Sequence, residues 1–340
     1  MAKKIFLIIL GLVVVGGVAW YVDRNFIRTK GTNSTQEPAV PESDATVTPL
    51  PAENTNKNTS ESIVFLVNNE NSKEIIKSDV KGSRKTLFTD EDEEFKIQKI
   101  GGLAYYASEV LVLTGKGDPS SNKLEVIKTD GSGKKETIVE SFGDPAAIAI
   151  SPDGKSIGFV SFSNVEEDYG YSIYTMTRDG SNRRKQVTAD KEIRGLSWNK
   201  DSNKVAFIKL GDSGKSTIQI TDVEKEKTNE IFSTDKVILG LTWNESGKIS
   251  FSVAPAGKLS ESQFLVINPD GGNQKKIFET TKGAIVSPAL SSDNLNLAYA
   301  LGELKDKIEE DVPADVYIGK SSGKNLDKIQ KGNLVIGWSP

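Results

Sequence analysis

The chain has 340 residues, enough for one large repeat domain or two ordinary ones, and its formal net charge of −4 provides no basic field for nucleic acid. It contains no cysteine and no histidine. These absences exclude disulfides, thiolate metal sites, cysteine nucleophiles, Ser-His-Asp triads and HExxH zinc sites.

The N-terminal region, residues 1–30, contains an unbroken apolar run of 18 residues from Ile5 to Val22. This length is near the lower limit for a helix that spans a bilayer, and Trp20 and Tyr21 at its end are typical of an interfacial aromatic belt. We therefore expect a retained single-pass transmembrane anchor, with the rest of the chain on the extracytoplasmic side of the cell membrane. The alternative is a cleavable signal peptide whose cleavage site follows Ala19.

Residues 31–62 are rich in Thr, Ser, Asn, Pro and Glu and show no apolar periodicity. Such a segment cannot bury enough surface to fold, so we expect a disordered linker. As a flexible coil it would span roughly 30 Å, which is useful to a domain that must stand away from a membrane.

From Ile63 onward the sequence repeats. One motif recurs with Ile150, Trp198, Trp243, Leu290 and Trp338 at equivalent places, 45 to 48 residues apart. A second motif, exemplified by VIKTDGSGKKETIV from Val126, lies between successive copies of the first. Each motif is a short β-branched or aromatic run, a tight polar turn and another such run, which is the signature of a β-hairpin. Two hairpins in each repeat predict the four-stranded blade of an all-β propeller.

The two ends of the repeat region complement each other. The folded region, residues 63–340, begins with a run that matches the second strand of a blade, and residues 334–340 match a first strand. We therefore expect the N- and C-terminal strands to pair and to close a ring of six blades. Closure removes the exposed edges that an open array would leave.

The repeats resemble the TolB-type propeller repeat, whose hallmark is an SPDG-like turn between the first two strands. That turn occurs here as Ser151-Pro152-Asp153-Gly154, with looser versions at residues 199–203, 244–247 and 291–294. The resemblance covers residues 63–340 and implies a six-bladed propeller. It departs from TolB itself because a stalk, and no α/β domain, precedes the propeller.

Two sets of repeated residues have a structural interpretation. The tryptophans Trp198, Trp243 and Trp338 occupy the same place in the repeat, so we expect them to pack between adjacent blades and not to form a ligand platform. The turn aspartates occupy positions that tight turns demand, because Asp bonds to its own backbone and Gly reaches positive φ. These aspartates are Asp79, Asp130, Asp179, Asp222 and Asp270.

The connections divide into two faces. The loops between second and third strands and the connections between blades lie on one face, which we call the long-loop face. The turns between first and second strands and between third and fourth strands lie on the other, which we call the short-turn face. Long, variable loops on a rigid scaffold usually carry binding function. The acidic clusters of the sequence all fall on the long-loop face, where we expect a binding surface made of Asp90, Glu91, Asp92, Glu166, Glu167, Asp168, Tyr169, Glu309, Glu310 and Asp311.

The short turns are rich in lysine and arginine. The prominent basic residues are Lys81, Arg84, Lys85, Arg183, Arg184, Lys185, Lys275 and Lys276. The linker enters at the start of a second strand, which lies on the short-turn face, so we expect that face to look toward the membrane. Basic residues near an anionic bilayer contribute about 1 kcal/mol of attraction each.

These features together predict a membrane-tethered, non-catalytic module that binds a protein, a peptide or a cell-wall polymer, with no cofactor or metal and no nucleic acid. A carboxylate-based carbohydrate-active enzyme is one alternative. The predicted first strands carry almost no carboxylate, which disfavours it. A purely structural assembly element is the other alternative.

Overall fold

The computed structural model describes residues 61–211, 215–302, 314–324 and 326–339. The expected anchor and nearly all of the expected linker lie outside these residues. Within the described ranges, no helix has the length and apolar character needed to cross a membrane. The secondary structure of the described chain consists of β-strands and two short 3-10 helices, Pro119–Ser121 and Glu166–Asp168.

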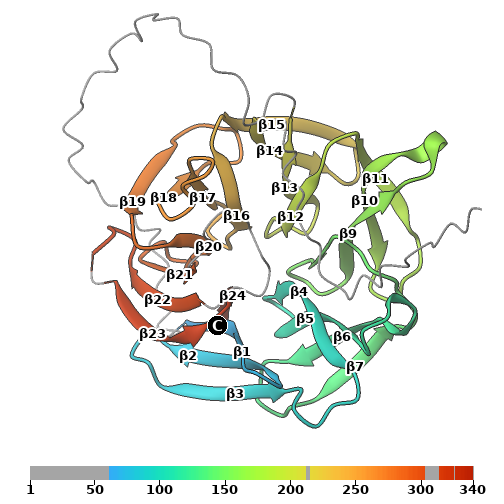
Figure 1. Ribbon diagram of the computed structural model, residues 1–340, viewed down its shortest axis with the longest axis horizontal. Helices are drawn as coiled ribbons and strands as arrows, with labels where there is room; N and C mark the ends of the chain where they lie inside the picture. Colours follow the sequence, from blue (N-terminus) through green and yellow to red (C-terminus); the bar gives the residue numbers. More distant parts are fainter. Residues whose placement is uncertain (1–60, 212–214, 303–313, 325, 340) are drawn as a thin grey trace, which may run out of the picture.

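The strands form six antiparallel sheets of four strands each, arranged as blades around a central axis (Figure 1). This arrangement confirms the predicted all-β, six-bladed propeller. From the axis outward, blade 1 consists of β24 (Leu334–Ser339), β1 (Ser62–Asn68), β2 (Lys73–Asp79) and β3 (Arg84–Thr89). Blade 2 consists of β4 (Lys96–Ala104), β5 (Glu109–Gly115), β6 (Lys123–Lys128) and β7 (Lys135–Val139).

The other four blades follow in chain order. Blade 3 consists of β8 (Ala147–Ile150), β9 (Ser156–Ser163), β10 (Gly170–Thr177) and β11 (Arg184–Ala189). Blade 4 consists of β12 (Ile193–Trp198), β13 (Lys204–Leu210), β14 (Ser216–Asp222) and β15 (Lys227–Thr234). Blade 5 consists of β16 (Val237–Trp243), β17 (Ile249–Ala254), β18 (Ser262–Ile267) and β19 (Lys275–Thr280). Blade 6 consists of β20 (Ala284–Leu290), β21 (Asn296–Gly302), β22 (Ala314–Lys320) and β23 (Asp327–Gly332).

Blade 1 contains strands from both ends of the described chain. β24 pairs with β1 in an antiparallel ladder that places Ser62 opposite Ser339 and Ile63 opposite Trp338. The backbone N–H of Asn333 also donates to the Leu66 carbonyl at 2.8 Å. The innermost strand of blade 1 therefore comes from the C-terminal end of the chain.

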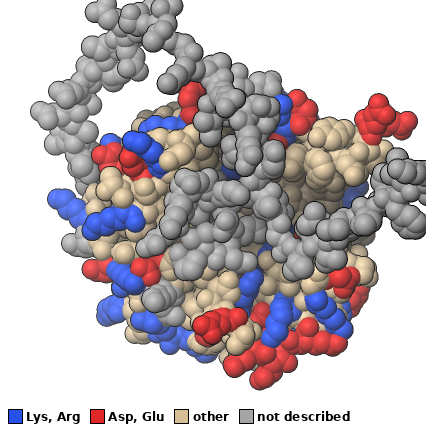
Figure 2. Space-filling view, viewed as in Figure 1, with Lys and Arg blue, Asp and Glu red and all other residues tan. Residues whose placement is uncertain are grey.

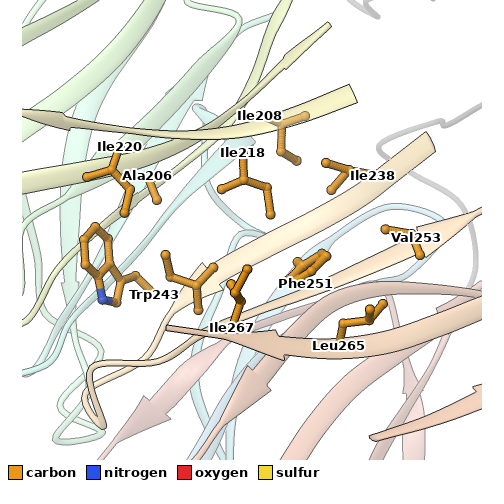
Figure 3. Close-up of a cluster of buried hydrophobic side chains, with 11 residues drawn as sticks. Ala206, Ile208, Ile218, Ile220, Ile238, Trp243, Phe251, Val253, Leu265 and Ile267 are labelled. Atoms are coloured by element: carbon orange, nitrogen blue, oxygen red, sulfur yellow. The ribbon is translucent and has the colours of Figure 1, made fainter. Parts of the chain in front are cut away.

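Hydrophobic contacts between adjacent blades hold the ring together. Figure 3 shows one such cluster, in which Ile208 and Ile218 of blade 4 face Phe251 and Leu265 of blade 5. Phe251 and Ile218 are fully buried. Burying a large apolar side chain contributes about 1.5–3 kcal/mol, so each junction between blades is a substantial part of the core.

The three aligned tryptophans are buried, with 3%, 7% and 5% of their surface exposed at Trp198, Trp243 and Trp338. The indole Nε1 of Trp198 donates to the Ala149 carbonyl of the preceding blade at 3.3 Å. Trp338 makes the equivalent bond to the Ala289 carbonyl at 3.4 Å. The predicted packing between blades is confirmed.

The aspartates of the short turns accept hydrogen bonds from the backbone N–H two residues further on, with N–O distances between 2.8 and 3.2 Å. Hydrogen bonds from the Thr177 and Ser181 hydroxyls, and then from the Ser181 backbone N–H, lower the pKa of Asp179 to about 2. The structural role predicted for this set of residues is confirmed.

Five of the six innermost strands carry a β-bulge, an extra residue or residues without an opposite partner. The bulged residues include Gln98 in β4, Gly195 in β12, Leu239 in β16, Ser287 and Pro288 in β20, and Ile336 in β24. Ser287 adopts a left-handed φ of 51° there. Bulges bend a strand and re-aim its side chains, and they often lie next to binding sites.

Candidate functional site

The innermost strands surround a cavity of about 670 Å³ that follows the propeller axis. Its wall consists mainly of aliphatic residues and glycines of β4, β8, β12, β16, β20 and β24. The three buried tryptophans also line it. The cavity therefore has an apolar body, and its polar groups gather at the two ends.

At the short-turn end of this channel, the turn between β4 and β5 reaches across the axis. It belongs to blade 2, which lies opposite blade 5 in the ring (Figure 1). The Tyr106 phenol nevertheless contacts the Glu245 carboxylate of blade 5, and the Tyr105 phenol contacts the Ser292 side chain of blade 6. The two rings meet edge to face with their centroids 5.2 Å apart. Tyr105 and Tyr106 thus form a cap over this end of the channel.

Two carboxylates support the cap. Glu61, the first described residue, accepts hydrogen bonds from the backbone N–H and the hydroxyl of Ser292. Burial raises the pKa of both the Glu61 and the Glu245 carboxyls above their usual range. Burial and the hydrogen bond with Glu245 raise the pKa of Tyr106 to about 12. The last residues of the expected linker segment, at Glu61, are therefore held directly beside the cap.

At the long-loop end, two half-buried cations from the innermost strands line the channel. The Lys99 ammonium lies 3.5 Å from the Asp144 carboxylate, and the Arg194 Nε lies 2.6 Å from the Glu192 carboxylate. Lys73 lines the same end. Among the described residues, the polar rim here carries three cationic and two anionic side chains, and the Arg194 guanidinium holds both oxygens of Glu192.

An exposed aromatic cluster stands beside this end, on the connection between β9 and β10. Phe162, Val165 and Tyr169 are 48%, 60% and 60% exposed. The Phe162 ring contacts those of Tyr169 and Tyr171, with centroid separations of 5.7 and 4.8 Å. We call these four side chains the aromatic hairpin. Phe162 and Tyr171 also line the mouth of the channel.

The structure separates the predicted acidic residues into different groups. Glu166 and Glu167 are exposed on the aromatic hairpin's own loop, next to Tyr169, and Glu91 and Asp92 are exposed between β3 and β4. The backbone position of Asp168 is described and its side chain is not. Glu309, Glu310 and Asp311 lie outside the described residues.

Asp90 does not belong to an accessible surface. Only 1% of it is exposed, and its two carboxylate oxygens accept hydrogen bonds from the backbone N–H groups of Lys73, at 2.6 Å, and Ile97, at 2.9 Å. Its carboxylate therefore joins blade 1 to blade 2. The expectation that Asp90 contacts a partner is corrected to this structural role.

The predicted basic residues lie mostly on the outer wall of the propeller and not on a flat face. Lys81 and Arg183 are in turns, whereas Arg84 and Lys85 belong to β3, Arg184 and Lys185 to β11, and Lys275 and Lys276 to β19. These are outermost strands. In the view of Figure 2, basic and acidic side chains are both found around the rim.

Several of these cations have local partners. The Arg183 guanidinium lies 4.6 Å from the centre of the Phe159 ring. Lys85 donates to the Asp130 carbonyl at 3.1 Å, and Lys276 pairs with Glu279 at 2.9 Å. The Arg84 guanidinium donates to the Ile329 carbonyl at 2.9 Å. The Lys85 and Arg84 bonds join blade 1 to blades 2 and 6, whereas the Arg183 and Lys276 contacts lie within their own blades.

Sequence reasoning missed the cap, the paired charges of the channel and most of the aromatic hairpin. The sequence does hold one signal for the hairpin, since Phe162, Val165, Tyr169 and Tyr171 are four apolar residues around the predicted loop EED. No comparable signal links Tyr106 to Glu245, because the contact depends on the curvature of the whole ring.

No family model matches the chain, and no curated protein matches it. Solved structures share its fold. TolB from Acinetobacter baumannii aligns with a TM-score of 0.61 and 17% identity, over 83% of this chain and 67% of that one. A putative TolB from Agrobacterium tumefaciens aligns with a TM-score of 0.60 and 12% identity, over 82% and 94%. A chain of a nidogen/laminin complex aligns with a TM-score of 0.56 and 14% identity, over 82% and 97%.

Proposed function

Because the chain has a TolB-like propeller fold, we propose that it is a non-catalytic binding module that takes a protein or peptide partner on its long-loop face. The observation that carries the proposal is the aromatic hairpin. Phe162 at the end of β9 and Val165 and Tyr169 on the loop that follows it are all exposed. Adjacent exposed apolar side chains of this size mark interaction sites, and aromatic residues dominate the energetics of protein interfaces.

The charge beside the hairpin defines the partner's chemistry. Glu166 and Glu167 are exposed within the same loop. Carboxylates at the rim of an interface favour a partner with basic residues and increase its rate of association. We therefore infer that the partner segment combines apolar side chains with lysine or arginine.

A peptide selection tests this proposal. We expect a random peptide library, selected on the full-length protein, to enrich sequences with lysine or arginine next to apolar residues. Tyr169→Ala and Phe162→Ala should each weaken the selected peptide's Kd at least tenfold, the loss typical of an aromatic hot spot. Glu166→Gln/Glu167→Gln should weaken it less and reduce its salt dependence.

Val80→Ala is the matched control, since Val80 is an exposed apolar residue on a short turn. It should leave the Kd unchanged. Selected peptides that bind the Phe162→Ala and Tyr169→Ala variants as tightly as the original protein would contradict the proposal. If the protein instead binds purified cell-wall polymer, and the Phe162→Ala and Tyr169→Ala variants lose that binding, the partner is a polymer and not a peptide.

The carbohydrate-active enzyme is less well supported. Within the described part of the channel wall, Asp144 and Glu192 form ion pairs with Lys99 and Arg194. Glu245 lies at the opposite end, against Tyr106. Glycoside hydrolysis needs two carboxyl groups that flank one bond, and this distribution does not favour such a pair.

We propose further that Ile5 to Val22 tether the module to the cell membrane, with the propeller on the extracytoplasmic side. The apolar run and the polar segment after it support this. The mature protein should then sediment with membranes, resist extraction by high salt and dissolve in detergent. A soluble form that begins at Trp20 would instead indicate a cleaved signal peptide.

A further inference from the structure

The central channel has the size of a small-molecule site, and binding of a peptide at the aromatic hairpin does not account for it. Ligand pockets usually measure about 300–1,000 Å³ and combine an apolar wall with a few polar groups. The channel measures about 670 Å³. Tyr105 and Tyr106 lie across its short-turn end, so a ligand enters from the long-loop end.

The charged groups of the channel are engaged with one another. At the long-loop end, the Arg194 guanidinium holds both carboxylate oxygens of Glu192, at 2.6 and 3.3 Å. At the short-turn end, the Tyr106 phenol is hydrogen-bonded to the Glu245 carboxylate. A charged ligand would lose its hydration without gaining a free counter-charge, so the channel favours an uncharged molecule.

The channel wall departs from the repeat at the junction between blades 4 and 5. The Nε1 atoms of Trp198 and Trp338 each donate to a backbone carbonyl of the preceding blade. By the repeat, the carbonyl that corresponds to these for Trp243 is that of Ser197. In the part of the chain that the structure describes, however, Trp243 Nε1 has no hydrogen bond, although the side chain is only 7% exposed. A buried donor without an acceptor is unfavourable, so a ligand that supplies an acceptor gains affinity there.

The Ser197 hydroxyl lies beside this tryptophan. Its oxygen accepts the backbone N–H of Trp243 at 2.8 Å, and both residues line the channel. The O–H of Ser197 has no acceptor among the described residues. β12 and β16 end at this level, where the short turns begin, so both donors lie near the capped end. The aliphatic Leu196, Leu239 and Leu241, which precede them in the same strands, line the channel toward its mouth.

We propose that the channel binds an uncharged small molecule that has an apolar body and a carbonyl group. The carbonyl oxygen accepts hydrogen bonds from Trp243 Nε1 and the Ser197 hydroxyl near the capped end. The apolar body lies along the aliphatic wall toward the mouth. This site is distinct from the proposed peptide surface, although Phe162 and Tyr171 border both.

Three probes with one phenylalkyl body test the inference. The probe 4-phenylbutan-2-one has a carbonyl group, butylbenzene has no polar group, and 4-phenylbutan-2-amine is a cation. Each is titrated into the full-length protein by isothermal titration calorimetry. We expect the ketone to bind saturably and about tenfold more tightly than the amine, because the buried ammonium would have no free counter-charge. Butylbenzene reports on the apolar wall alone.

Trp243→Phe and Ser197→Ala should each weaken binding of the ketone about fivefold, the net contribution of one hydrogen bond. Butylbenzene should bind both variants as it binds the original protein, which shows that the cavity is intact. Trp198→Phe is the matched control, because it makes the same ring change where the indole N–H is already bonded to the Ala149 carbonyl. It should leave the ratio of the ketone and butylbenzene affinities unchanged.

Four results would each overturn the proposal. They are tighter binding of the amine than of the ketone, no saturable binding of the ketone, an unchanged affinity ratio in Trp243→Phe, and an equal fall of that ratio in Trp198→Phe.

Discussion

Deleting residues 334–340 should unfold the whole propeller and not only blade 1. The deletion removes β24, whose Val335, Ile336 and Trp338 are buried. Losing large core side chains costs about 2–5 kcal/mol each, and the sum is comparable with the whole stability of a domain, about 5–15 kcal/mol. It also exposes the edge of β1. Thermal unfolding of the full chain, followed by circular dichroism, measures the effect.

The converse experiment joins the ends covalently. Ser62 and Ser339 are opposite each other across the β1–β24 ladder, and the chain has no cysteine of its own. Opposite residues in antiparallel strands lie about 4.5–5.5 Å apart, within disulfide range. Ser62→Cys/Ser339→Cys should form an intrachain bond and raise the stability by about 2–5 kcal/mol.

Ser62→Cys/Ser181→Cys is the matched control, because Ser181 lies on a turn of blade 3. It should form no intrachain bond. A truncated protein that melts like the full one, or a 62–339 pair that does not oxidise, would show that the ends do not close the ring.

Substituting Arg178 should produce the second large effect. Glu109 at the start of β5 is only 2% exposed, and its carboxylate contacts Arg178 of blade 3 and Lys128 of β6. Arg178 also reaches Glu136 at 3.0 Å. Removing one partner of a buried ion pair leaves an uncompensated charge, so Arg178→Met should cost about 3 kcal/mol at neutral pH.

The double variant Glu109→Met/Arg178→Met should recover much of that loss, because apolar side chains of similar volume replace the pair. Chemical denaturation of the two single variants and the double variant provides the comparison. Equal stability of Arg178→Met and the original protein would show that Lys128 alone compensates Glu109.

The same cluster predicts a pH dependence. Burial alone would raise the pKa of Glu109, but the hydrogen bonds from Arg178 and Lys128 outweigh it and lower the pKa below its usual 4.5. A carboxyl with a lowered pKa in the folded state stabilises the fold above its unfolded pKa. This contribution is lost as the pH falls through the folded value. The stability difference between the original protein and Glu109→Gln should therefore shrink below about pH 4.5.

The repeat made the blades predictable, because a strand, a polar turn and a second strand are local patterns. β4 departs most from the pattern. Its bulges at Gln98 and at Gly101–Gly102 interrupt the alternation of the sequence motif. The structure starts the first strand at Ser62, one residue before the predicted start at Ile63.

The site was less predictable, because its contacts join residues far apart in the chain. Asp90 stands in a run of acidic residues, and the sequence does not distinguish it from Glu91 or Asp92. Only the fold places Lys73 and Ile97 beside its carboxylate. In the same way, only the arrangement of six blades around an axis brings Tyr106 of blade 2 to Glu245 of blade 5.

The proposed function places a peptide partner at the aromatic hairpin on the long-loop face. Amide hydrogen exchange of the full-length protein, with and without the selected peptide, tests it most directly. We predict slower exchange in residues 161–171 and in the adjacent loop at residues 190–193, with no change in short turns such as residues 269–274. Protection of the short turns, with unchanged exchange at residues 161–171, would contradict the claim.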